Sequence, residues 1–129
     1  QAMVMMLVAL AGPAMNFLLA VLSALAVRGI EYLGRGVAQG TLAYSVLEPL
    51  LYMCAAGVTV NIALGIFNML PVPPLDGSNV LAAFLPPRMA MRYQSFGRWG
   101  FLLLILLAVF GVLGKLIGQP VAVLSRMLL

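Results

Sequence analysis

The sequence predicts an all-α, polytopic membrane protein with about three transmembrane helices. Of its 129 residues, 64% are hydrophobic and only 8% are charged, whereas soluble domains carry about 25% charged residues. The apolar residues gather in three long runs, over residues 3–27, 51–70 and 99–116. Each run is long enough to cross about 30 Å of hydrocarbon at about 1.5 Å per helical residue. We treat residues 1–129 as a single transmembrane domain.

The first run, residues 3–27, is apolar except for small residues, Asn16 and Ser23. As a helix it would extend roughly 37 Å, enough to cross the bilayer with some tilt. Arg28 ends the run, and a short polar connection containing Glu31 follows. This pattern predicts the first crossing.

The second crossing is predicted at residues 51–70, where the apolar run is uninterrupted. Residues 41–50 before it are also apolar but contain Glu48 and Pro49, so we expect a re-entrant or interfacial piece there. After the run, three of the four residues 71–74 are proline. Because proline lacks a backbone N–H and restricts its predecessor, we expect extended or turned backbone from residue 71 to 77.

A short helix is expected after the proline segment, capped by Asp76 or Ser78 and ending near Phe84. The third crossing is predicted at residues 99–116. The apolar tail, residues 120–129, is too short to cross alone, so we expect it to form an interfacial helix.

The net charge of +4 comes from seven basic and three acidic residues, and the sequence contains no histidine. Such sparse positive charge favours loops that face anionic lipid and argues against a nucleic-acid partner. The single cysteine, Cys54, cannot form a disulfide within the chain. Basic residues are expected on both sides of the membrane, so their count leaves the orientation open.

Two predicted helices carry matching stripes of small and polar residues at offsets 0, 4, 8 and 11. These are Gly12, Asn16, Ala20 and Ser23 in the first helix, and Gly57, Asn61, Gly65 and Asn68 in the second. Such offsets place each set on one helix face. The stripes are either packing faces or the walls of a polar cavity that also receives Asp76. Internal repeats of a transporter would give a similar pattern.

Asp76 is one of only three acidic residues and lies two residues after the last of the clustered prolines. A carboxylate in a membrane setting is costly unless it has a partner, a proton, water or a metal ion. An Asp-Gly pair commonly forms a turn or a helix N-cap. A carboxylate on stiff, non-helical backbone is also well suited to binding a cation, because fixing its position costs little further entropy. The residues alone leave both uses open.

Two segments resemble a known family. FNMLPVPPLDG, residues 67–77, resembles the Asn-x-x-Pro-x-x-Pro-Leu-Asp-Gly segment of the site-2 proteases, which are zinc-dependent intramembrane peptidases. AGPAMN, residues 11–16, resembles the Gly-Pro-x-x-Asn segment of a preceding helix in that family. The resemblance extends over nearly the whole chain and is strongest to the compact bacterial group, which implies a multi-pass protein of the bacterial inner membrane.

The resemblance implies roles for particular residues. Asp76 matches the family's third protein ligand to zinc, and Asn68 matches an asparagine that helps to bind substrate or stabilise the reacting carbonyl. Asn16 matches a position with a structural or substrate-contact role, and Asn61 is a further candidate for active-site support because it shares a stripe with Asn68. The implied cofactor is zinc, and the implied substrate is a transmembrane protein or peptide.

The family's other two zinc ligands and its general base come from a His-Glu-x-x-His helix, which this sequence lacks. In the family that helix precedes the Gly-Pro segment, so we expect the sequence to be the C-terminal part of a larger protease and to be inactive alone. Neither Glu31 nor Glu48 lies in a motif that could replace the base. Residues 77–79 also depart from the family, which often has a second glycine and then a basic residue or histidine.

Two alternatives remain at this stage. The chain could belong to a non-catalytic membrane protein, such as a transporter segment or a packing scaffold, or to a protease relative that has lost its catalytic helix. A His-Glu-x-x-His sequence upstream would favour the protease. The substrate identity and the oligomeric state stay open.

Overall fold

The computed structural model describes residues 2–129 and is entirely helical apart from turns over that range. This confirms the predicted all-α class. The six helices are α1 (Ala2–Leu33), α2 (Leu42–Asn68), α3 (Asp76–Ala83), α4 (Pro87–Ser95), α5 (Gly97–Val109) and α6 (Val112–Leu128).

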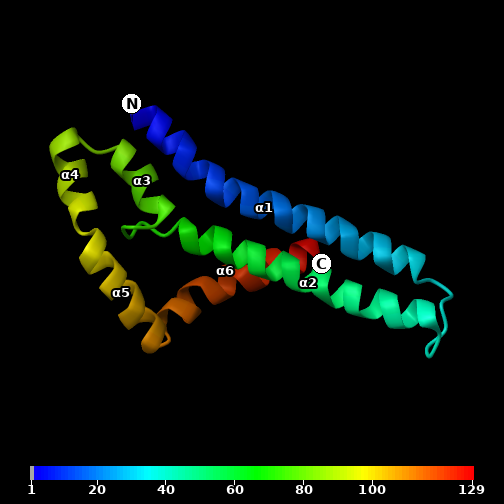
Figure 1. The fold of residues 1–129 in the computed structure, drawn as a ribbon. Helices are drawn as coiled ribbons and strands as arrows, with labels where there is room; N and C mark the ends of the chain where they lie inside the picture. Colours follow the sequence, from blue (N-terminus) through cyan, green and yellow to red (C-terminus); the bar gives the residue numbers. More distant parts are fainter. Residues whose placement is uncertain (1) are drawn as a thin grey trace.

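Helices α1 and α2 form a long antiparallel hairpin that dominates the molecule (Figure 1). Both are long and apolar enough to cross a membrane, with mean hydropathies of 2.1 and 2.0 over an 18-residue stretch within Met3–Leu33 and Leu42–Asn68, respectively. The pair α5 and α6 adds a third span if the two bent helices are counted as one. These helices confirm a polytopic membrane protein.

The hairpin helices are longer than the apolar runs that predict them. Helix α1 continues past Arg28 to Leu33, and α2 begins at Leu42 with Pro49 inside it. Residues 42–50 therefore continue into α2 and do not form the separate re-entrant piece that was one of the two expectations; an interfacial position for them stays a prediction. Thr41 caps α2 by accepting a 3.2 Å hydrogen bond from the Tyr44 N–H. Helix α2 also packs along α1. Together these contacts offset the single hydrogen bond that an internal proline removes.

Small side chains bring α1 and α2 close together at the centre of the hairpin. The core consists of Ala20 and Ala24 from α1 with Val58 and Ile62 from α2, each no more than 4% exposed. Helix α6 covers this cluster with its own apolar side chains, Val121, Leu124 and Leu128. The core therefore joins the α1–α2 hairpin to α6, which is far from it in the sequence.

The two stripes meet in this packing. A Cβ on Gly57 would stand 3.0 Å from the Ser23 hydroxyl, and a Cβ on Gly65 would stand 3.0 Å from the Phe17 ring. Such close contacts need a glycine on one side, as in other membrane helix pairs. At these positions the structure supports the packing alternative.

The third apolar run is not one straight helix. Helix α5 ends after Val109, and α6 leaves it at a bend of 78°. Gly111 sits at the bend with a φ of +76°, a left-handed conformation that glycine adopts without steric cost and that commonly ends helices. The predicted crossing at residues 99–116 is therefore corrected to two helices with a sharp turn.

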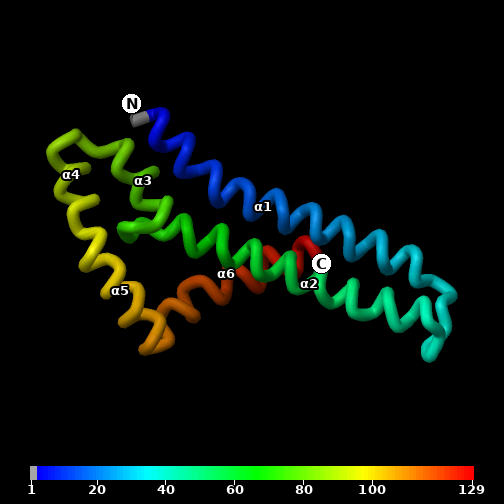
Figure 2. Tube along the Cα trace, viewed as in Figure 1, coloured from blue at the N-terminus to red at the C-terminus, as the bar shows by residue number. Residues whose placement is uncertain are grey.

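The C-terminal helix is longer than expected and packs on α2 rather than standing apart (Figure 2). Its last turn reaches the middle of the hairpin, where the Arg28 Nη2 donates a 3.1 Å hydrogen bond to the Leu128 carbonyl. A cation at a helix C-terminus satisfies an orphan carbonyl and is favoured by the helix dipole.

Candidate functional site

The proline segment joins α2 to α3, and its backbone is turned, as the sequence predicts. The Leu75 N–H donates to the Val72 carbonyl at 2.9 Å, and the Ser78 N–H donates to the Leu75 carbonyl at 3.0 Å. The Pro73–Pro74 peptide bond is cis. The segment delivers the chain directly into the first turn of α3, where Asp76 lies.

Asp76 does not cap α3. The N-cap position is Leu75, and no side chain provides a capping hydrogen bond. Ser78 turns back and donates its hydroxyl to the Leu75 carbonyl at 2.6 Å. The prediction that Asp76 or Ser78 caps the helix is wrong, because the helix begins at Asp76 itself, one residue too early for Asp76 to occupy the N-cap position. The carboxylate is left available for another partner.

The Asp76 carboxylate lies against α1 at Gly12. A Cβ built on Gly12 would stand 2.9 Å from the Asp76 Oδ2, closer than side chains normally approach. The absence of a side chain at Gly12 therefore makes the space that the carboxylate occupies. This contact brings together the two segments, residues 11–16 and 67–77, that carry the family resemblance.

A cavity of about 230 Å³ opens beside Asp76. Two α3 residues, Asp76 and Asn79, supply its polar groups, and the rest of its lining comes from α1: Val4, Met5, Val8 and Ala9. A carboxylate beside such apolar walls is stabilised by a bound cation. In its local environment, Asp76 therefore fits the part of one anionic metal ligand.

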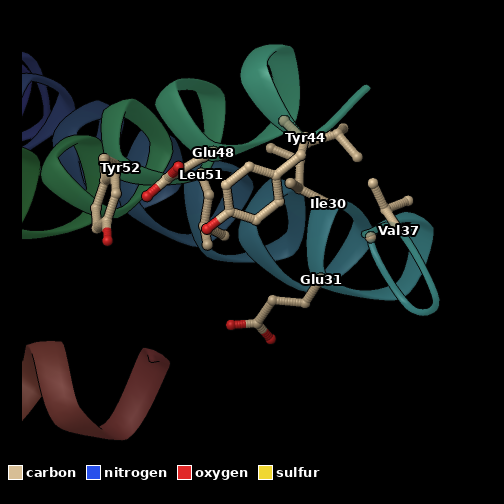
Figure 3. A pocket seen from close by; sticks show the side chains of 9 residues that line it. Ile30, Glu31, Val37, Tyr44, Glu48, Leu51 and Tyr52 are labelled. Carbon is tan, nitrogen blue, oxygen red and sulfur yellow. The ribbon is translucent and has the colours of Figure 1, made fainter. Parts of the chain in front are cut away.

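The rest of a metal site is not found within residues 2–129. Nowhere in this range do three His, Cys, Asp or Glu side chains gather closely enough to hold an ion. The other two acids, Glu31 and Glu48, line a separate cavity of about 270 Å³ between the far ends of α1 and α2 (Figure 3). The described residues therefore fit one member of a zinc ligand set and not a complete set.

The predicted asparagines lie outside the lining of the Asp76 cavity. Asn61 donates its amide to the Gly57 carbonyl at 2.8 Å within its own helix, which satisfies one of its polar groups locally. Asn16 is half-buried on α1, and Asn68 is half-buried at the last residue of α2. Within the part of the chain that the structure describes, none of the three lines this cavity. Their role in active-site support stays a prediction.

The structure adds residues that sequence reasoning missed. Asn79 lines the cavity three residues after Asp76, a helical spacing that places both on one face of α3. Gln94 donates its Nε2 amide to the Asn79 Oδ1 at 2.6 Å, and the Tyr93 hydroxyl donates to the Pro71 carbonyl. Burial raises the pKa of the Tyr93 phenol above its usual value of 10.0. The Asp-x-x-Asn spacing could have identified Asn79 from the sequence. No local sequence pattern indicates the contacts that Tyr93 and Gln94 of α4 make.

Comparison with known proteins agrees with this arrangement. The profile of Peptidase family M50 matches residues 34–110, which is more than half of the chain. A protein of Bacillus subtilis (strain 168) named "Putative zinc metalloprotease YwhC" is 33% identical over 52 residues, covering 40% of this chain and 24% of that protein. The chain thus aligns with about a quarter of the relative's length. No solved structure matches the chain. Taken with the two motif segments, the profile match means that the chain belongs to peptidase family M50, the site-2 protease family.

Proposed function

We propose that the complete protein is a zinc-dependent peptidase that hydrolyses peptide bonds within the membrane, and that Asp76 is its third zinc ligand. The observation that carries this proposal is the uncapped Asp76 carboxylate held against Gly12 beside an apolar cavity. The family membership supplies the reaction class, and the relative's name includes a zinc metalloprotease.

The residues of this chain would prepare one side of the site. A zinc ion, when bound, would polarise the scissile carbonyl and lower the pKa of a bound water. Asp76 would supply an anionic oxygen ligand from the space that the missing side chain of Gly12 leaves open. The apolar walls from α1 would limit access of bulk water, and Asn68, Asn61 and Asn16 would support the substrate or the surrounding helices.

The remaining ligands are proposed to come from outside these residues. The sequence contains no histidine, and residues 2–129 hold no three-ligand cluster. We infer that a His-Glu-x-x-His helix elsewhere in the complete protein supplies two ligands and the general base. Residues 1–129 alone would therefore not hydrolyse peptides.

The proposed setting is the bacterial inner membrane, with lipid around the helices and a transmembrane protein or peptide as substrate. Two helices that suit membrane spans support a bilayer location. A transporter or scaffold role is less well supported. The stripes that suggested it include Gly57 packed against Ser23 and Asn61 bonded within its own helix.

The test compares two carboxylate-to-amide variants of the full-length protein, Asp76→Asn at the proposed site and Glu48→Gln in the distant cavity. Zinc content is measured by elemental analysis, and cleavage is measured with a transmembrane peptide. Asp76→Asn should lose most bound zinc and at least about 100-fold in cleavage rate, because an anionic ligand is lost, while Glu48→Gln should match the natural protein. Full zinc content and activity in Asp76→Asn would exclude the proposal.

A further inference from the structure

We infer that Tyr93 and Gln94 of α4 are positioning residues that hold the Asp76-bearing segment at its two ends and so set the metal affinity of the site. The inference rests on the proposed function, because it assigns a role to contacts around the proposed ligand. It concerns residues 71–79, which run from the first proline through Asp76 to Asn79.

The first contact holds the beginning of the segment. Pro71 follows α2 directly, and its carbonyl accepts a hydrogen bond from the Tyr93 hydroxyl, 22 residues further along the chain. A carbonyl in this break has no regular helical partner, because the prolines that follow interrupt the ladder of backbone hydrogen bonds. Tyr93 therefore supplies from α4 a partner that the local backbone cannot.

The second contact holds the end of the segment. The Gln94 Nε2 donates to the Asn79 Oδ1 at 2.6 Å. Asn79 lies between the cavity beside Asp76 and a second cavity of about 170 Å³, which Gln94 also lines. Asn79 is thus shared by the linings of the two cavities, and its hydrogen bond to Gln94 holds α3 three residues after Asp76.

Helix α4 is attached through this same face. Its half-buried residues are Ala90, Tyr93 and Gln94, and its other residues are exposed. Adjacent residues on a helix point about 100° apart, so Tyr93 and Gln94 reach the two ends of the segment from one turn. The two half-buried polar side chains of α4 therefore both form hydrogen bonds with the segment that carries Asp76.

Close backbone contacts leave the segment little freedom between these two points. A Cβ on Gly77 would collide with the carbonyl oxygens of Met69 and Leu70, and a Cβ on Gly100 of α5 would collide with the carbonyl of Pro73. The segment is thus packed between the end of α2 and the start of α5. With both ends held, the Asp76 carboxylate keeps its place against Gly12 before any metal binds, which lowers the entropic cost of binding.

The experiment measures zinc affinity of the full-length protein by competition with a chromogenic chelator. The variants are Tyr93→Phe and Gln94→Met, which remove the hydrogen bonds and keep most of the side-chain volume. The matched controls are Tyr52→Phe in the distant cavity and Gln119→Met on the exposed surface of α6. Each test variant should bind zinc about threefold to tenfold more weakly, the range expected for one neutral hydrogen bond, and each control should bind as the natural protein does.

Two further readouts separate positioning from a purely structural role. In the cobalt-substituted protein, the visible absorption bands report ligand geometry, and they should shift in Tyr93→Phe and Gln94→Met but not in the controls. An Asn79→Ala change added to Gln94→Met should weaken zinc binding no further, because both changes remove the same hydrogen bond.

The outcomes distinguish this inference from the proposed function. Natural zinc affinity and cobalt spectra in both test variants would overturn the positioning role, even if their unfolding temperatures fell, since the two residues would then only attach α4. The proposed function would still stand in that case if Asp76→Asn loses its zinc. Zinc retained by Asp76→Asn would instead overturn the proposed function, and this inference with it.

Discussion

The Oδ2 atom of Asp76 lies 2.9 Å from the point where Gly12 would carry a Cβ. The two residues are on different helices and in different motifs, and the contact brings both motifs to one place. A side chain at position 12 and a carboxylate at position 76 would compete for the same space.

Replacing Gly12 with Ala should disturb the proposed ligand without unfolding the protein. The added methyl group would force the Asp76 carboxylate to move, so zinc affinity of the full-length protein should fall about tenfold or more, as for changes beside a metal ligand. Chelator competition measures this effect. Gly29→Ala in the same helix is the matched control, because a Cβ there meets nothing within 4 Å. Equal affinities in the two variants would show that Asp76 does not depend on this space.

Replacing Gly77 with Ala should destabilise the fold itself. Here the new methyl group would meet the carbonyl oxygens of Met69 and Leu70, which are backbone atoms that cannot rotate away. Overpacking of this kind costs about 1–3 kcal/mol. Thermal unfolding should show a clear loss, whereas Gly118→Ala in α6, with open space around it, should be neutral or slightly stabilising. An unchanged unfolding temperature in Gly77→Ala would contradict the close approach of α3 to α2.

Removing the guanidinium of Arg28 should loosen the end of α6. Its hydrogen bond to the Leu128 carbonyl is exposed, so Arg28→Met should cost at most about 1 kcal/mol of global stability. The local effect should be larger, with faster amide hydrogen exchange in the last turn of α6 and unchanged exchange at the centre of α2. Arg35→Met is the control, because it removes a guanidinium that lies over the Tyr32 ring, 5.3 Å from the ring centroid, and leaves the hydrogen bond between Arg28 and Leu128 in place. Unaltered exchange in Arg28→Met would indicate that packing alone holds α6.

Tyr93 should ionise late in an alkaline titration. Burial raises the pKa of its phenol above 10.0, so ultraviolet absorbance should show one of the four tyrosines titrating last, and Tyr93→Phe should remove that component. A raised pKa means that the folded state holds the proton more tightly than the unfolded state. The contribution to stability is therefore retained below pH 10 and declines as pH rises through the raised pKa. A normal titration of Tyr93 would contradict the burial of its phenol.

Much of the fold could be predicted because the relevant signals are local. Apolar runs of membrane length predict helices through backbone hydrogen bonding and hydrophobicity alone, and the clustered prolines predict the break before α3. The exact ends of the helices were harder to predict from the sequence. Pro49 is accommodated inside α2, and Gly111 turns an apolar run by 78°, because capping and packing decide whether a single proline or glycine interrupts a helix.

The sequence by itself determined that this is a helical membrane protein and that Asp76 is its most distinctive acidic residue. A carboxylate is conspicuous in a chain with 8% charged residues, whatever its surroundings. Only the tertiary structure decided what surrounds it: Gly12 against one carboxylate oxygen, Asn79 along the cavity wall, and Tyr93 and Gln94 at the two ends of its segment. These contacts join residues that are distant in the sequence, and local patterns carry no information about which distant side chains meet once the helices pack.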